Sequence, residues 1–322
     1  MFYEYSITPD VFDPASLGGN PATALILTQL LRGICENGMI SDLHKSGWSR
    51  DIAKRVEGIP SQKTKANVMK LLEVLKDRKR LVRHPKAAND PADDVQWLEL
   101  AREAHGRAPL DAIVLTPNLL ASCGIDDEIL IGLDDVLDSD PWLHRRRSAT
   151  IKQQEADYRN LLPKVLRHAK RLWLIDPYFR PDRRQWTDTI EVCASLMGQR
   201  GGDVLRGIIE VHTGDPGKRN TPLSPKDEIT AWDQWKKDHF TPNYPHTLSV
   251  SMWGSRVNGE RFHDRLLITD QVGFQIAGGL DCMTPPIGTP SDTVWTLLDE
   301  KDRLLWLGKF QEGTSPYDRI TT

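Results

Sequence analysis

The strongest structural signal in the chain is Arg261-Phe-His-Asp-Arg-Leu-Leu-Ile-Thr-Asp-Gln-Val-Gly-Phe-Gln-Ile-Ala-Gly-Gly-Leu-Asp281. Two apolar runs separated by a short polar turn predict a pair of strands over residues 261–270 and 272–277. Because side chains alternate between the two faces of a strand, we expect His263 and Arg265 to lie side by side on one face.

An imidazole and a guanidinium presented together suit attack on a phosphorus centre. Arg265 can bind phosphate oxygens through its planar fork, and its positive charge favours the neutral, nucleophilic form of His263. The stretch therefore predicts a phosphate-handling site centred on His263.

Outward from this pair, the second half of the chain alternates between helical and strand patterns. Helical spacing continues from 148 to 170 and leads into an apolar run, Arg171-Leu-Trp-Leu-Ile175, which ends in Asp176. The remaining expected elements are a helix near 182–197, a strand at 204–212, a helix near 226–238 and a strand at 247–253. This alternation favours an α/β fold.

The first part of the chain carries mostly helical patterns. We expect an extended start at 3–8, helices over 21–45 and 48–82, and a strand at 110–116 between prolines. The predicted organisation is a mainly helical N-terminal domain of unknown role, 1–147, followed by an α/β domain, 148–322.

Polar residues at strand ends are candidates for substrate binding, because loops converge there in α/β sheets. Asp176 and Tyr178 follow one predicted strand, and His212 ends another. The turn after the final strand adds further candidates, which are Gly278, Gly279 and Asp281.

These residues resemble the phospholipase D superfamily, whose signature is His-x-Lys, four residues, Asp, then usually six residues and a Gly-Ser-x-Asn-like turn. This chain reads His263-Asp-Arg265-Leu-Leu-Ile-Thr-Asp270. Leu172-Trp-Leu-Ile-Asp-Pro-Tyr-Phe179 also looks like the first strand of such domains. The resemblance covers roughly residues 160–310 and implies a mixed β-sheet flanked by helices.

The resemblance also implies roles for the site residues. His263 would be the nucleophile of a phosphodiesterase, Arg265 the phosphate clamp and Asp270 the orienting carboxylate, without metal or other cofactor. A second histidine protonates the leaving group in this family. Because the chain holds one copy of the signature, we expect a homodimer in which a second His263 takes that part.

The chain departs from the family pattern at two points. Arg265 replaces the lysine, and Ala277-Gly-Gly-Leu-Asp281 stands in place of the Gly-Ser-x-Asn-like turn. The His-Asp-Arg variant is similar to phospholipase D-like domains in bacterial defence and mobile-element proteins.

Three functions stay open. The first is a metal-independent nuclease. The second is a catalytically inactive module that binds nucleic acid, phospholipid headgroups or the partner proteins of an antiviral defence operon. The third is metal-dependent hydrolysis at Asp176, His212 and His263.

Composition narrows the substrate and the setting. The 322 residues are 39% hydrophobic and 27% charged, which is typical of a folded globular protein. We expect a cytoplasmic protein, because no apolar run is long enough to span a membrane. Basic runs at 76–86 and 145–147 favour nucleic acid over lipid as the substrate.

Overall fold

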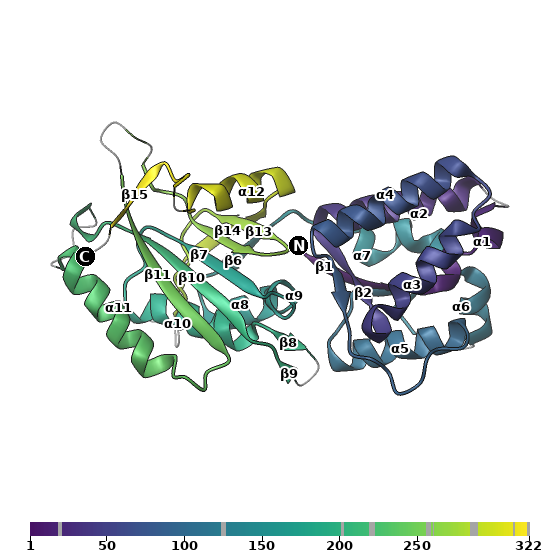
Figure 1. Ribbon diagram of the computed structural model, residues 1–322, viewed down its shortest axis with the longest axis horizontal. Helices are drawn as coiled ribbons and strands as arrows, with labels where there is room; N and C mark the ends of the chain where they lie inside the picture. Colours follow the sequence, from purple (N-terminus) through teal and green to yellow (C-terminus); the bar gives the residue numbers. More distant parts are fainter. Residues whose placement is uncertain are drawn as a thin grey trace. The chain divides into compact units, whose positions relative to one another are not determined.

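The structure, a computed structural model, describes residues 1–18, 21–123, 127–200, 203–218, 223–255, 259, 261–283, 289–311 and 313–320. Its contacts divide the chain into two compact units, Met1–Arg146 and Arg147–Thr322. Each unit is built around its own sheet, so the chain as described is mixed α/β (Figure 1). No helix among the described residues combines the length and the apolar character needed to cross a bilayer.

The first unit contains a parallel sheet in the order β3-β2-β1-β4-β5, as far as its described residues show. Its strands are β1 (Tyr3–Ile7), β2 (Gly38–Asp42), β3 (Leu81–Arg83), β4 (Ala112–Leu115) and β5 (Leu130–Gly132). Its helices are α1 (Pro14–Gly18), α2 (Pro21–Asn37), α3 (Leu43–Glu57), α4 (Gln62–Asp77), α5 (Asp94–Arg107), α6 (Pro117–Cys123) and α7 (Asp140–Leu143), with 3-10 turns at Pro9–Phe12 and Leu133–Asp138. Helices α2 and α4 pack against each other, as Figure 1 shows.

Two strands of this sheet lie where the sequence predicts helix. β2 interrupts the helix expected over 21–45, and β3 occupies the end of the helix expected over 48–82. Every residue of β2 is buried, because the strand lies between β1 and β3. Burial on both faces removes the alternation that marks a strand in sequence, so the short apolar run reads as a continuation of the helix.

The second unit contains a mixed sheet whose described strands have the order β15-β11-β10-β7-β12-β13-β14-β6. The strands are β6 (Ser148–Lys152), β7 (Arg171–Ile175), β10 (Gly207–Gly214), β11 (His246–Ser255), β12 (Leu266–Thr269), β13 (Gly273–Ile276), β14 (Asp292–Leu297) and β15 (Tyr317–Ile320). A separate small ribbon pairs β8 (Gln199–Arg200) with β9 (Asp203–Val204). β7, β10 and β11 run parallel, whereas β12 runs antiparallel to β7.

Helices pack on both faces of this sheet. The helices are α8 (Glu155–Leu161), α9 (Pro163–Leu166), α10 (Arg184–Leu196), α11 (Pro225–His239) and α12 (Glu300–Lys309), with a 3-10 turn at Pro216–Lys218. α12 and the following Phe310 pack on the face that carries Ile175, Leu266 and Ile268. α8 lies on the opposite face, where Tyr158 meets Trp295 edge-on at 5.4 Å.

One strand of the second unit was predicted as the start of a helix. Residues 148–152 form β6, which pairs antiparallel with β14, and their side chains alternate between exposed and half-buried. The strand partner lies far away in the sequence, so the pairing that selects strand over helix is not visible locally. The strands and helices expected between 171 and 253 are present with shifted ends.

Candidate functional site

The stretch 261–281 forms the expected antiparallel strand pair, but the pair is shorter than predicted. β12 and β13 pair with Leu266 opposite Gln275. His263 and Arg265 precede β12, so the expectation that they belong to the strand is wrong. The cause is the neighbouring β7, whose last residue Ile175 is already opposite Leu266. Arg265 keeps one backbone bond beyond the strand, since its carbonyl accepts from the amide of Ile276 at 2.9 Å.

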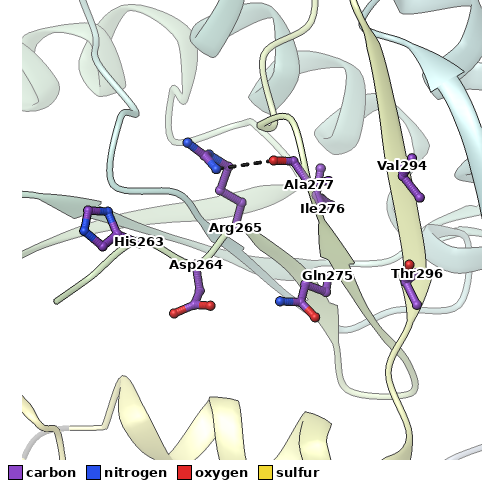
Figure 2. A pocket seen from close by; sticks show the side chains of 8 residues that line it. All are labelled: His263, Asp264, Arg265, Gln275, Ile276, Ala277, Val294 and Thr296. Atoms are coloured by element: carbon purple, nitrogen blue, oxygen red, sulfur yellow. Dashed lines mark hydrogen bonds between the residues drawn. The ribbon is translucent and has the colours of Figure 1, made fainter. Parts of the chain in front are cut away.

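Arg265 is held from several sides. Its Nη1 donates to the carbonyl of Ala277 at 3.4 Å, and its Nε lies 3.7 Å from Oδ2 of Asp176. Its guanidinium carbon also lies 5.2 Å from the centre of the Tyr178 ring, which is a cation–π distance. Figure 2 shows Arg265 and Asp264 projecting to opposite sides of the chain. The site thus presents one oriented guanidinium.

His263 is exposed and lines a pocket of about 330 Å³. The pocket is also lined by Asp264, Arg265, Gln275, Ile276, Ala277, Val294 and Thr296 (Figure 2). Most of these side chains are polar, and β14 adds the exposed Val294 to the lining. His263 and Arg265 therefore both line one solvent-open pocket.

Asp176 is fully buried directly after β7. Its Oδ1 accepts from the amide of Tyr178 at 2.9 Å, and its Oδ2 accepts from the amide of Leu280 at 3.1 Å. Burial raises the pKa of Asp176 to about 6, and the two amides and Arg265 oppose this rise. The carboxylate therefore joins three segments: the end of β7, the approach to β12 and the turn after β13.

The turn 277–281 is fixed by side chains from other elements. The Nε2 of Gln153 donates to the carbonyl of Gly279 at 3.3 Å and to the carboxylate of Asp281, and the Oγ1 of Thr189 donates to the carbonyl of Leu280 at 2.6 Å. The amide of Gly278 donates to Thr293 at 3.0 Å. Burial raises the pKa of Asp281, while Gln153 and Arg265 lower it. Asp281 therefore lies in the turn after β13, close enough to Arg265 for the two charges to interact.

Gly279 has a conformation that requires glycine. Its φ of +119° lies in the region that L side chains rarely adopt, and an added Cβ would lie 2.9 Å from Oδ1 of Asp281. Because residue 279 has no side chain, the turn can approach the carboxylates of Asp281 and Asp176 closely.

Asp270 is not part of this group. It follows the opposite end of β12, is 8% exposed, and its Oδ1 accepts from the amide of Lys170 at 3.1 Å. The whole of β12 separates it from His263, so its predicted role as the carboxylate that orients the nucleophile has no geometric basis. Asp176 is the carboxylate that lies next to Arg265 instead.

His212 is not at the site either. It is buried, its Nδ1 accepts from the Nε1 of Trp253 at 2.9 Å, and its ring packs against Phe310. Burial lowers the pKa of His212 to about 3, so the ring is neutral. It lies in the apolar layer under α12, out of reach of a substrate, and the prediction that it binds one is wrong.

The metal site predicted at Asp176, His212 and His263 is not formed. In the part of the chain that the structure describes, no three His, Cys, Asp or Glu side chains converge to hold an ion. In particular, Asp176 is buried, His212 packs under α12 and His263 is exposed, so this predicted triad is not assembled.

Sequence reasoning missed Gln153 and Tyr158. Tyr158 donates to the carbonyl of Asp281 at 3.2 Å, so both side chains support the turn. They follow β6, which the sequence suggested was helical. Recognising the alternation of residues 148–152 as a strand would have indicated that this region joins the site.

Comparisons with known proteins add little to this geometry. No family model matches the chain, and no curated protein matches it. Among solved structures, the chain is similar to TrmBL2, an archaeal chromatin protein whose structure shows a novel mode of DNA binding. The identity is 14% over 80% of this chain and 83% of that one, with a TM-score of 0.28. A likeness at that level carries no argument about fold or function.

Proposed function

We propose that the second unit is a phospholipase D-like, metal-independent phosphodiesterase, and specifically a nuclease. The observation that carries the proposal is that exposed His263 lines the same pocket as Arg265, whose guanidinium is held by Asp176, Tyr178 and the carbonyl of Ala277. A guanidinium held in this way can bind two oxygens of a phosphodiester and stabilise charge that develops on them.

The proposed reaction needs two histidines. A ring nitrogen of His263 attacks phosphorus and forms a phosphohistidine, while the P–O bond to the leaving alcohol breaks. The His263 of a second copy gives its proton to that alcohol, and the same histidine then takes a proton from the water that releases the phosphate. A homodimer is therefore part of the proposal, with a mass of twice 36.5 kDa.

Nucleic acid is the proposed substrate because of the lining of the pocket. Gln275 and Thr296 offer an amide and a hydroxyl that can bond to sugar or base, whereas a diacyl lipid would need an apolar groove. The basic runs contribute less than expected. Arg78 and Arg80 each donate to the carbonyl of Cys35 at 2.6 Å, so two cations of the first run have structural bonds.

A specific observation favours a second function, a catalytically inactive module. Two carboxylates, Asp176 and Asp281, lie near Arg265, and their negative charge opposes phosphate binding when both are ionised. Such a module would bind nucleic acid, phospholipid headgroups or partner proteins in a cytoplasmic antiviral defence system.

The test is incubation of the purified chain with single- and double-stranded DNA and RNA in EDTA. His263→Ala is compared with His144→Ala, which removes a histidine of the first unit whose side chain is 71% exposed. Cleavage lost only in His263→Ala supports the nuclease. Binding without cleavage by the wild type supports the inactive module, and the absence of both rejects a nucleic-acid role.

A further inference from the structure

Asp176 cannot touch a substrate in this structure. Its side chain is 0% exposed, and each of its two oxygens accepts a backbone amide, from Tyr178 and from Leu280. The sequence-based expectation that it binds substrate directly is therefore wrong. Burying a carboxylate this deeply costs free energy unless the carboxylate is paired. Its position beside Arg265 therefore calls for a role other than direct contact with substrate.

The contacts of Arg265 indicate what that role is. Asp176 occupies the Nε edge of the guanidinium, the Tyr178 ring covers its plane, and the carbonyl of Ala277 takes a hydrogen from Nη1. The edge that carries the second terminal nitrogen has no bond to any described residue, and Arg265 lines the pocket of His263. These three contacts restrict the orientation of the guanidinium.

Asp176 also supports the two other contacts of Arg265, those with the Tyr178 ring and with the carbonyl of Ala277. Its Oδ1 fixes the backbone of Tyr178, whose ring lies on the guanidinium, and its Oδ2 fixes Leu280 in the turn that begins with Ala277. One carboxylate therefore acts on the clamp directly through Nε and indirectly through both other contacts.

We propose that Asp176 is a positioning residue that orients Arg265 for binding one phosphate group in the pocket of His263. The nature of the anion rests on the proposed function, whereas the orientation of the guanidinium does not. Preorganised donors bind an anion more tightly because less freedom is lost on binding.

An asparagine cannot replace this carboxylate. Asn has one oxygen and one NH₂ group, so the NH₂ would face either the amide of Tyr178 or that of Leu280, donor against donor. It would also lose its attraction to Arg265. Asp176→Asn is therefore expected to release the clamp while changing the side-chain volume very little.

The sign of the effect separates positioning from simple charge. Asp176→Asn removes a negative charge beside an anion site, so electrostatics alone predict tighter phosphate binding, whereas positioning predicts binding weaker by about tenfold. The matched control is Asp264→Asn, which removes a carboxylate from the lining of the same pocket and should tighten binding.

The first measurement is the dissociation constant for inorganic phosphate at pH 7.5, by calorimetry on the full chain. The double-mutant cycle with Arg265→Lys completes it, because an effect exerted through Arg265 must shrink when the guanidinium is absent. Equal or tighter binding by Asp176→Asn, or an equal loss in the Arg265→Lys background, would overturn the proposal.

A second measurement needs neither substrate nor folded variants at position 176. The Nε–Hε signal of Arg265, assigned by its absence in Arg265→Lys, should move as Asp176 titrates near pH 6. The other titratable groups around Asp176 are Asp281, Arg265 itself and Tyr158, whose pKa is raised by burial so that it stays neutral. His263 and Asp264 line the same pocket as Arg265, so the titration is repeated in His263→Gln and in Asp264→Asn, where it should persist. Asp281→Asn should leave the titration in place.

The two measurements fail separately. If the wild type does not bind phosphate but the Nε–Hε signal titrates, the proposed function is wrong and the positioning contact stands. A signal that does not move between pH 5 and 7 rejects the positioning contact, whatever the phosphate affinity is.

Discussion

The pKa values of two buried titratable residues, Asp176 directly after β7 and His212 within the neighbouring β10, shift in opposite directions on burial. His212 has its pKa lowered to about 3, and Asp176 has its pKa raised to about 6. In both cases the protein interior disfavours the charged form. The folded state therefore releases a proton from His212 and retains one on Asp176 in the mildly acidic range. Only Asp176 belongs to the site, because His212 lies under α12.

The pH dependence of stability should reveal the buried, neutral His212. The unfolded chain protonates His212 below about pH 6.5, whereas the folded chain does not until about pH 3. The stabilisation is complete above pH 6.5 and falls by about 1.4 kcal/mol per pH unit as the pH drops through this window. His212→Gln should lack this dependence, and Asp176 should contribute the opposite slope between about pH 4 and 6 in both proteins.

Urea unfolding of the wild type and His212→Gln between pH 4 and 7 measures the difference. The glutamine can still accept from Trp253, which keeps the packing comparable. A difference in unfolding free energy that does not change with pH would show that His212 is accessible to protons in the folded state.

At the scale of elements, α12 covers one face of the sheet through a few large contacts. Phe310 directly follows α12 and meets the rings of His212, Trp253, Phe262 and Tyr317 at centroid distances of 5.2–5.9 Å. The helix also exposes apolar residues, since Leu304 is 54% exposed. The apolar contacts of Phe310 therefore anchor the carboxyl end of the helix, while buried Arg303 donates to the carbonyl of Thr269 at 2.9 Å nearer its start.

Phe310→Ala should lower the free energy of unfolding by about 3–5 kcal/mol, because it empties a ring-sized space in a packed cluster. Leu304→Ala is the matched control and should change it by less than about 0.5 kcal/mol, since most of its side chain is already in water. Both values come from urea unfolding. Equal losses in the two variants would contradict the packing of α12 described here.

At the scale of the whole molecule, the two units have separate cores. The cluster around β1 and β4 draws its described members from the first unit, and the cluster under α12 draws its members from the second. The second unit begins before its first strand, because the amide of Leu297 donates to the carbonyl of Arg147 at 2.7 Å.

A fragment of residues 147–322 should therefore fold and unfold cooperatively, whereas 154–322 should not. The shorter fragment lacks β6, so β14 becomes an unpaired edge that can pair with other chains, and it also loses Gln153 from the turn. Circular dichroism with urea and light scattering checks both fragments. If 154–322 is as stable as 147–322 and aggregates no more than it does, β6 is not an integral strand of the sheet.

The local sequence pattern was sufficient to predict part of the fold of this protein. The alternation of helix and strand from 171 to 253 and the strand pair within 261–281 follow from residue spacing, and His263 and Arg265 line one pocket although both precede β12. Spacing predicts these elements because side-chain period and turn chemistry act over a few residues.

Tertiary structure alone decided the rest. β2, β3 and β6 are strands only because distant partners pair with them, and no local pattern reports such a partner. Likewise, the assembled sheet brings Asp176 rather than Asp270 next to Arg265, and it buries His212 away from the site. Which carboxylate meets a cation depends on strand register and on the end of the strand that carries it, and both are set by the assembled sheet.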